Sequence, residues 1–167
     1  MRLFGIPCLV GFVFAGAASA GDLPDPATTP GAMAPDVTQA NIATTICVPG
    51  FTKPPRRPPV SYTSAFKRAQ LAAVGGDQDP RDFEEDHLVP LSLGGAPQDP
   101  RNLWPEHWAD PWGARTKDRL ELKLHELVCA GTIPLAQAQH DIATDWIIAY
   151  RRYCPTEAEC PSYRGGE

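Results

Sequence analysis

Residues 83–106, "FEEDHLVPLSLGGAPQDPRNLWPE", bring residue types that can do chemistry into one short part of the chain. Asp86 and His87 are adjacent, and Asn102 follows within the same stretch. The imidazole of a histidine has an ordinary pKa of about 6.5, so it can accept a proton near neutral pH. The stretch is either a surface loop between two strands or a catalytic hairpin that holds a metal ion, and the elements around it must decide.

The surrounding pattern predicts an α+β fold in the order helix, strand, long loop, strand, helix, helix. Thr63 or Ser64 is expected to cap the first helix, and Gly75-Gly76 to stop it. The predicted elements are a helix over 61–75, strands over 83–90 and 102–106, and helices over 116–129 and 132–153. The predicted apolar faces of the last two helices are Leu120, Leu124, Leu127 and Val128, then Leu135, Ala138, Ile142, Trp146 and Ala149.

The first 20 residues predict a signal peptide. Arg2 gives a positive start, residues 3–17 are apolar or small, and Ala18-Ser19-Ala20 fits the small-x-small cleavage rule. Cleavage after Ala20 would release an exported chain, either secreted or periplasmic, with no stable membrane association. An uncleaved membrane anchor is the alternative, but the apolar run is too short and too rich in Gly and Ala for a convincing span.

The segment after the signal peptide is rich in Pro, Ala and Thr and has no apolar periodicity. Residues 21–44 therefore predict a flexible leader. The folded domain is expected over 45–167 and begins near Ile46. Its first part, "CVPGFTKPPRRPPVSYT" over 47–63, has too many prolines for a regular element and predicts an extended arm along the surface.

Four cysteines remain after removal of the signal peptide: Cys47, Cys129, Cys154 and Cys160. An even number in an exported chain predicts disulfides, and four cysteines allow three connectivities. We favour Cys154–Cys160, which closes a short loop in the tail and leaves Cys47 to join Cys129. Thiolates holding a metal ion are the alternative, but the chain has no C-x-x-C pair.

The charge of the chain is acidic. All 167 residues carry a formal net charge of −5, and loss of Arg2 makes the exported chain −6. This sign argues against a general polyanion binder, because contacts to phosphates need Lys and Arg. The basic residues are nevertheless grouped, as in "KPPRRPP" and "RTKDR", so a local basic groove is compatible with the sequence.

The motif "DHLVPLSLGG…NLWPE" followed by a charged helix resembles the HNH, or ββα-metal, nucleases. Over residues 45–153 the chain also looks like small exported bacterial proteins with an HNH-like core, through "ICVPGFT", "RPPVSYT", "GAPQDPRNLWPE", "KDRLE", "LHELVCAG" and "AQHDIATDWIIAYRRY". The resemblance implies a hairpin-plus-helix core with flanking helices. It also implies metal-dependent hydrolysis of phosphodiester bonds.

The resemblance assigns roles to individual residues. His87 would be the general base that takes a proton from the attacking water. Asp86 would bind one divalent cation, which stabilises the leaving oxyanion as a Lewis acid. Asn102 would fix the imidazole or the loop around it, and Gly94 and Gly95 would permit the tight turn.

The helix ligand of the metal departs from the family pattern. HNH enzymes usually offer a His or Asn in the first turns of that helix, and this chain has neither. Asp118 is our expected second ligand, with Glu121 as the alternative, and two carboxylates favour Mg²⁺ or Mn²⁺ over zinc. Arg115 or Lys117 is expected to bind the substrate phosphate directly.

The sequence thus predicts a monomeric, exported endonuclease that cuts nucleic acid, DNA rather than RNA, without strong sequence preference. The main rival is a non-catalytic binding or scaffold protein that keeps the hairpin, and the acidic charge and missing helix His favour it. A cell-wall hydrolase with Glu85 and Asp86 as paired carboxylates ranks last. Adjacent strand residues point to opposite faces, so these two could not flank one bond.

Overall fold

The protein has a mixed α+β fold, as the sequence predicts. A computed structural model describes residues 23–109 and 111–160, so the predicted signal peptide lies outside the described residues. The helices are α1 (Val60–Val74), α2 (Ala114–Cys129) and α3 (Leu135–Tyr153), and the strands are β1 (Phe83–His87) and β2 (Leu103–His107). Short 3₁₀ turns are η1 (Gln39–Thr44), η2 (Pro80–Asp82), η3 (Leu91–Leu93) and η4 (Pro100–Asn102).

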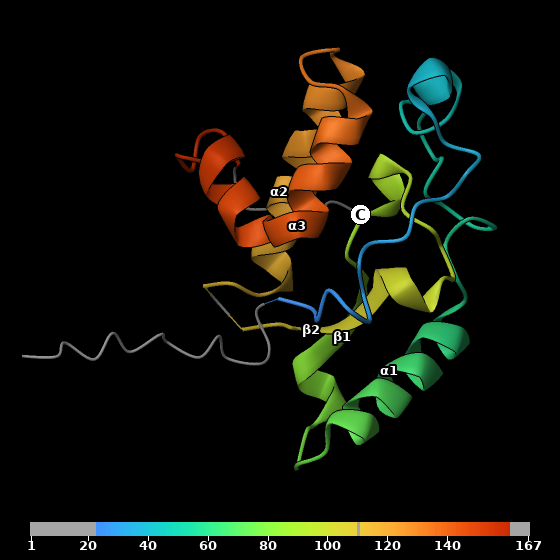
Figure 1. Cartoon of the computed structure of the whole chain (residues 1–167), viewed down its shortest axis with the longest axis vertical. Coiled ribbons are helices and arrows are strands. Elements are labelled where there is room, and N and C mark those ends of the chain that lie inside the picture. Colours follow the sequence, from blue (N-terminus) through green and yellow to red (C-terminus); the bar gives the residue numbers. More distant parts are fainter. Residues whose placement is uncertain (1–22, 110, 161–167) are drawn as a thin grey trace, which may run out of the picture.

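The two strands form an antiparallel hairpin at the centre of the molecule. Phe83 pairs with His107, and His87 pairs with Leu103. Figure 1 shows α1 on one side of this hairpin and the α2–α3 pair on the other. Helices therefore cover both sides of the hairpin, so polar side chains on its two faces are at least partly buried.

The main apolar core lies between α2 and α3. The side chains that the two helical periods predicted to face inwards are almost all buried, which confirms both helices. Leu120, Leu124, Val128, Leu135, Ala138, Ile142, Trp146 and Ala149 are at most 2% exposed. Leu127, also predicted for this face, is only half-buried.

Helix α1 begins earlier than the sequence predicted. The expected N-cap was Thr63 or Ser64, but the helix starts at Val60 with Pro59 at the cap position. Proline fixes its own φ near the helical value, here −60°, so it prepares the chain for a helix without a capping side chain. The Gly75 stop is confirmed, with φ +78° at the C-cap.

The expectation of a flexible leader is wrong for the described part of residues 21–44. Ala34 and Val37 are buried, and the Ala34 amide donates to the Gly94 carbonyl at 2.9 Å. The Gly31 amide donates to the Arg101 carbonyl at 2.9 Å. The segment is held by backbone hydrogen bonds and isolated apolar contacts, which leave no periodic signal in the sequence.

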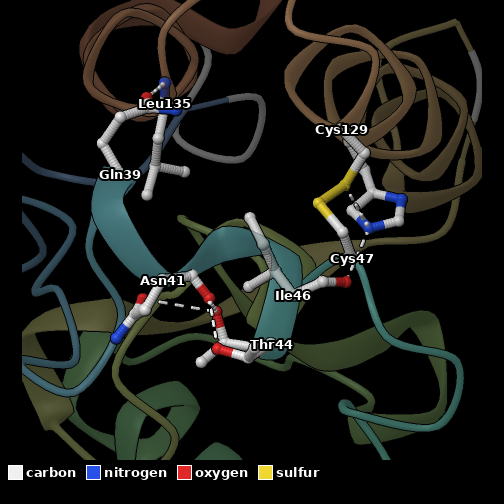
Figure 2. The surroundings of a disulfide bond; sticks show 9 residues. Gln39, Asn41, Thr44, Ile46, Cys47, Cys129 and Leu135 are labelled. Atoms are coloured by element: carbon white, nitrogen blue, oxygen red, sulfur yellow. Dashed lines mark hydrogen bonds between the residues drawn. A yellow bond between two sulfur atoms is a disulfide. The ribbon is translucent and has the colours of Figure 1, made fainter.

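Both predicted disulfides are present. Cys47–Cys129 joins the N-terminal segment to the end of α2, and Cys154–Cys160 closes the loop after α3. Figure 2 shows the first disulfide beside η1, where the Gln39 side chain also accepts from the Leu135 amide at 2.7 Å. Because all four sulfurs are bonded in pairs, the thiolate metal site considered as an alternative is not formed.

The helices of the described residues were also considered as membrane spans. None of those in residues 23–109 and 111–160 combines the length and the apolar character that a bilayer crossing requires. The paired cysteines fit an oxidising compartment.

The two disulfides should differ in their contribution to stability. A disulfide restricts the unfolded chain more when it closes a longer loop, and the sequence separations here are 82 and 6 residues. We expect the C47S/C129S variant to lose about 4 kcal/mol of unfolding free energy and the C154S/C160S variant about 2 kcal/mol. Urea denaturation of the oxidised proteins measures both values. Equal losses, or a larger loss for the tail disulfide, would contradict this assignment.

Candidate metal and catalytic site

The face of the hairpin that α2 covers is acidic. Successive side chains of a strand point to opposite sides, so Glu84 and Asp86 share one face of β1. Glu84 pairs with Glu106 of β2, and Asp86 pairs with Trp104, which places Glu106 on this face as well. Lys117 reaches the same face from the first turn of α2.

Lys117 lies at the centre of this acidic face and is fully buried. Its Nζ lies 2.5 Å from Asp86 Oδ2, donates to the His87 carbonyl at 2.9 Å and forms an ion pair with Glu121. Burial alone would lower the pKa of the ammonium, but the carboxylates of Asp86, Glu121 and Glu106 outweigh it and keep the pKa well above its usual value. Lys117 is therefore a charged internal counter-ion.

The expected role of Lys117 in binding the substrate is wrong. All three of its ammonium hydrogens have partners inside the protein, and the side chain has no exposed surface. Arg115, two residues earlier, is exposed, and its guanidinium lies over the Trp108 ring at 5.9 Å. Substrate binding by Arg115 stays a prediction.

Glu106 is the most unusual side chain of the site. It has no exposed surface, and among the described residues neither carboxylate oxygen accepts a hydrogen bond from a donor group. Its polar neighbour is the Asp86 carboxyl, with which a protonated Glu106 shares a hydrogen bond. One oxygen each of Glu84, Asp86 and Glu106 lies within 4.8 Å of the other two. Carboxylate oxygens only accept hydrogen bonds, so this group needs protons or a cation between its members.

The ionisation of the group reflects the same shortage of positive charge. Burial raises the pKa of Glu106 well above its usual value, and the charge of Asp86 adds to the effect while Lys117 opposes it. Burial likewise raises the pKa of Glu84 to about 8. At Asp86 burial is the largest single influence and would raise the pKa, but the charge and hydrogen bond of Lys117, with smaller effects of His87 and Glu106, together lower it. Without a further cation, one ammonium keeps Asp86 ionised but cannot balance its neighbours.

The structure groups Asp86 with different carboxylates from those assigned by sequence. Asp118 is exposed and does not belong to the group of three, while Glu121 contacts Lys117 instead. Glu84 and Glu106 were missed. Glu84 could have been found from the two-residue period of a strand, which puts its side chain on the same face as that of Asp86. Glu106 could not, because only the cross-strand register places it beside Glu84.

The opposite face of the hairpin carries His87. Its Nε2 lies 2.9 Å from the Pro97 carbonyl oxygen, and its side chain is 6% exposed. Burial lowers the pKa of His87, so the ring is neutral near pH 7. Because a carbonyl can only accept, the proton sits on Nε2 and Nδ1 keeps a free lone pair. A fixed neutral imidazole of this kind has the form that a general base requires.

Asn102 holds the loop between the strands. Its Oδ1 accepts from the Val89 amide at 2.9 Å, and its Nδ2 donates to the carbonyls of Val89 and Ala96 at 2.9 and 3.2 Å. Of the two roles expected for Asn102, it is the loop and not the imidazole that it contacts. Ala96 precedes Pro97, so Asn102 fixes the residue next to the acceptor of His87.

A glycine is required where this loop closes. A Cβ atom at Gly95 would lie 1.8 Å from the Val89 carbonyl oxygen and 2.7 Å from Asn102 Nδ2. No real Cβ atom approaches backbone so closely, so any side chain here would force the loop off Asn102. The Gly94-Gly95 turn predicted from sequence is thus needed for close approach of the backbone.

Glu85 also lies on the His87 face and is a second carboxylate without partners. Both of its oxygens are buried and have no hydrogen bond to any residue that the structure describes, and burial raises its pKa to about 8. Its cross-strand neighbour is Pro105, whereas that of Asp86 is Trp104. The two carboxylates point to opposite faces, which rules out their use as a pair on one glycosidic bond.

Comparisons with protein-family models, with curated proteins and with solved structures gave no match to this chain. The resemblance to HNH nucleases therefore rests on the motifs of residues 45–153. What the site can do must be argued from its own geometry.

Removal of the Lys117 charge should destabilise the fold. Lys117→Met keeps the length of the side chain but leaves Asp86 and Glu121 buried without their counter-ion, which costs about 3–5 kcal/mol. Lys123→Met, on the same helix but outside the acidic face, is the control and should change stability by about 0.5 kcal/mol or less. Urea denaturation in EDTA measures both. Similar losses for the two variants would show that Lys117 is not the counter-ion of the site.

Proposed function

We propose that the chain is an exported, metal-dependent endonuclease with an HNH-like ββα-metal core. It would hydrolyse phosphodiester bonds of nucleic acid, DNA rather than RNA, with low sequence specificity. The observation that carries this proposal is Glu106, a fully buried carboxyl group that has no cationic or N–H partner among the described residues and lies beside Asp86 and Glu84. The hairpin and α2 enclose this group, which is the arrangement expected for the metal centre of such a core.

The donor set fits a hard divalent cation. Glu84, Asp86 and Glu106 offer oxygen atoms close together, and oxygen ligands favour Mg²⁺ or Mn²⁺ over softer metals. Such a cation, when bound, would polarise a phosphoryl oxygen as a Lewis acid. It would also give the oxygens of Glu106 the positive partner that they otherwise lack.

The residues of the chain would supply the base and its orientation. His87 is neutral, and its Nε2–H is held by the Pro97 carbonyl, so Nδ1 is left to accept the proton of a water molecule. Asn102 keeps the loop that carries Pro97 in place. In this scheme Asn102 is a positioning residue and His87 is the catalytic base.

The cellular setting proposed from the sequence fits the disulfides. Two disulfides persist in an oxidising compartment, which supports secretion or a periplasmic location for the chain. A nuclease in that position would meet nucleic acid outside the cytoplasm. We propose that it acts as a monomer.

Two observations favour a rival function, a non-catalytic exported scaffold or binding protein. The Lys117 ammonium already neutralises part of the acidic face, and His87 is only 6% exposed. A protein that keeps the hairpin for its stability alone would need neither a cation nor an accessible imidazole. Metal-dependent cleavage distinguishes the two functions.

Cleavage should depend on both a divalent ion and His87. Purified residues 21–167 should nick plasmid DNA with Mg²⁺ or Mn²⁺ and not with EDTA. His87→Gln keeps a donor for the Pro97 carbonyl but has no basic nitrogen, so we expect nicking to fall by about 100-fold or more. His140→Ala, on the exposed side of α3, is the control and should cut as the wild type does.

His87→Gln is preferred to His87→Ala because the imidazole is buried and its loss would also remove a hydrogen bond. Circular dichroism and a melting curve establish that each protein is folded. A folded wild type that fails to nick with each divalent ion tested would reject the nuclease. A folded His87→Gln protein with full activity would reject His87 as the catalytic base.

Metal binding should depend on Glu106 more than on Asp118. Glu106→Gln removes one carboxylate of the group of three, so Mn²⁺ affinity should fall by about tenfold or more, whereas exposed Asp118→Asn should change it little. Isothermal titration of the folded proteins with Mn²⁺ gives both affinities. The opposite order would restore Asp118 as the helix ligand and remove Glu106 from the site.

A further inference from the structure

A groove of about 570 Å³ runs beside the site, between the Pro-rich segment and the loop after η3. We call residues 51–57, "FTKPPRR", the basic arm. Phe51, Lys53 and Arg56 form one wall of the groove, and Pro97 and Gln98 form the other. The groove thus joins the most basic run of the N-terminal half to the loop that orients His87.

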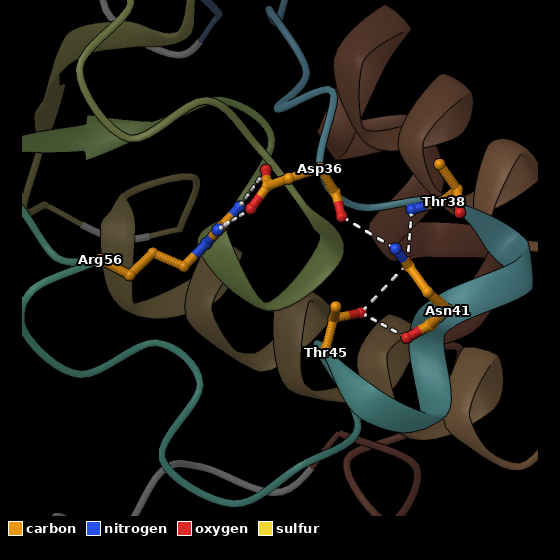
Figure 3. Close-up of polar contacts among 5 residues, drawn as sticks. All are labelled: Asp36, Thr38, Asn41, Thr45 and Arg56. Carbon is orange, nitrogen blue, oxygen red and sulfur yellow. Dashed lines mark hydrogen bonds and ion pairs between the residues drawn. The ribbon is translucent and has the colours of Figure 1, made fainter.

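The basic arm is held in place at Arg56. Its Nη1 lies 2.9 Å from Asp36 Oδ2, and its guanidinium stacks over the Phe51 ring at 4.3 Å. Asn41 of η1 donates to the Asp36 carbonyl at 2.9 Å, as Figure 3 shows. The packed N-terminal segment therefore fixes the arm, and the Arg56 charge in the groove wall is already paired with Asp36.

The other two cations of the arm remain available. Lys53 and Arg57 are exposed, and neither forms an ion pair with any residue in the described part of the chain. Lys53 lines the groove. Arg57 directly follows Arg56, which lines the same groove.

The far wall of the groove is one hydrogen bond from the imidazole. The Pro97 carbonyl accepts from His87 Nε2 at 2.9 Å, and the next carbonyl, that of Gln98, accepts from the Tyr62 hydroxyl at 3.0 Å. This wall is therefore tied both to the candidate base and to α1. A strand of nucleic acid lying in the groove would contact the loop whose Pro97 carbonyl accepts from His87.

We propose that the basic arm binds the phosphate backbone of the nucleic acid, through Lys53 and Arg57, and that the groove leads this strand to His87. The proposal rests on the proposed nuclease function. Because the whole chain is acidic, a polyanion is best held where exposed cations are gathered, and the arm carries two of them, Lys53 in the wall of the groove and Arg57 next to it.

The salt dependence of binding tests the arm without requiring cleavage. Fluorescence anisotropy of a labelled single-stranded DNA is followed in EDTA over a series of NaCl concentrations. Each phosphate contact contributes about 0.7 to the slope of log K against log salt for a single strand, so K53Q/R57Q should lower the magnitude of the slope by about 1.4. R68Q/K123Q removes the same charge outside the groove and should leave the slope unchanged.

The outcomes separate this proposal from the nuclease itself. Equal slopes for the two double variants, or no binding by the wild type, would overturn the arm as the binding surface. A wild type that binds with an arm-dependent slope but fails to nick DNA with each divalent ion tested would keep the arm and reject the nuclease. A wild type that nicks, with K53Q/R57Q unaltered in slope and in KM, would keep the nuclease and reject the arm.

Discussion

A buried ammonium surrounded by carboxylates is the interaction on which this structure depends. Lys117 brings α2 onto the hairpin by bonding Asp86 and the His87 carbonyl of β1 and Glu121 of its own helix. Burial of these charges is favourable only if each is paired, so the position of α2 relative to β1 is strongly specified. The same interaction leaves Glu106 beside the pair with no N–H or cationic partner among the described residues, and burial raises the pKa of its carboxyl well above the usual value. The chemical character of the site follows from this crowding of carboxyl groups around one ammonium.

The two faces of the hairpin divide the work of the proposed reaction. The acidic face would hold the cation, and the opposite face holds the imidazole of His87 against the Pro97 carbonyl. His87 is the last residue of β1, so the two could act on one phosphodiester only at this end of the strand, a position that Glu85, inside the strand, does not have. The connecting loop, closed by Asn102 and by the tight approach at Gly95, links the two because its Pro97 end also borders the groove of the basic arm. Base, cation site and strand-binding groove are thus positioned by one short segment of chain.

Much of the fold could be predicted from the sequence because its helices follow simple periods. Leu120 and Leu124 of α2 and Ile142 and Trp146 of α3 recur at helical spacing, and all are buried. The N-terminal segment escaped prediction because backbone hydrogen bonds hold it, with few apolar side chains. Lys117 was misjudged because lysine is rarely fully buried, and Glu106 was missed because its partners are set by the pairing of two strands, which no local pattern reveals.

The central claim is that a divalent cation binds among Glu84, Asp86 and Glu106. Anomalous diffraction from a crystal of residues 21–167 soaked with Mn²⁺ tests it most directly. The account predicts a strong anomalous peak between the hairpin and α2, in contact with the carboxylates of Glu106 and Asp86. The absence of an anomalous peak there, in crystals whose acidic face is open to solvent, would contradict the claim. Lys117 would then be the cation that balances these carboxylates.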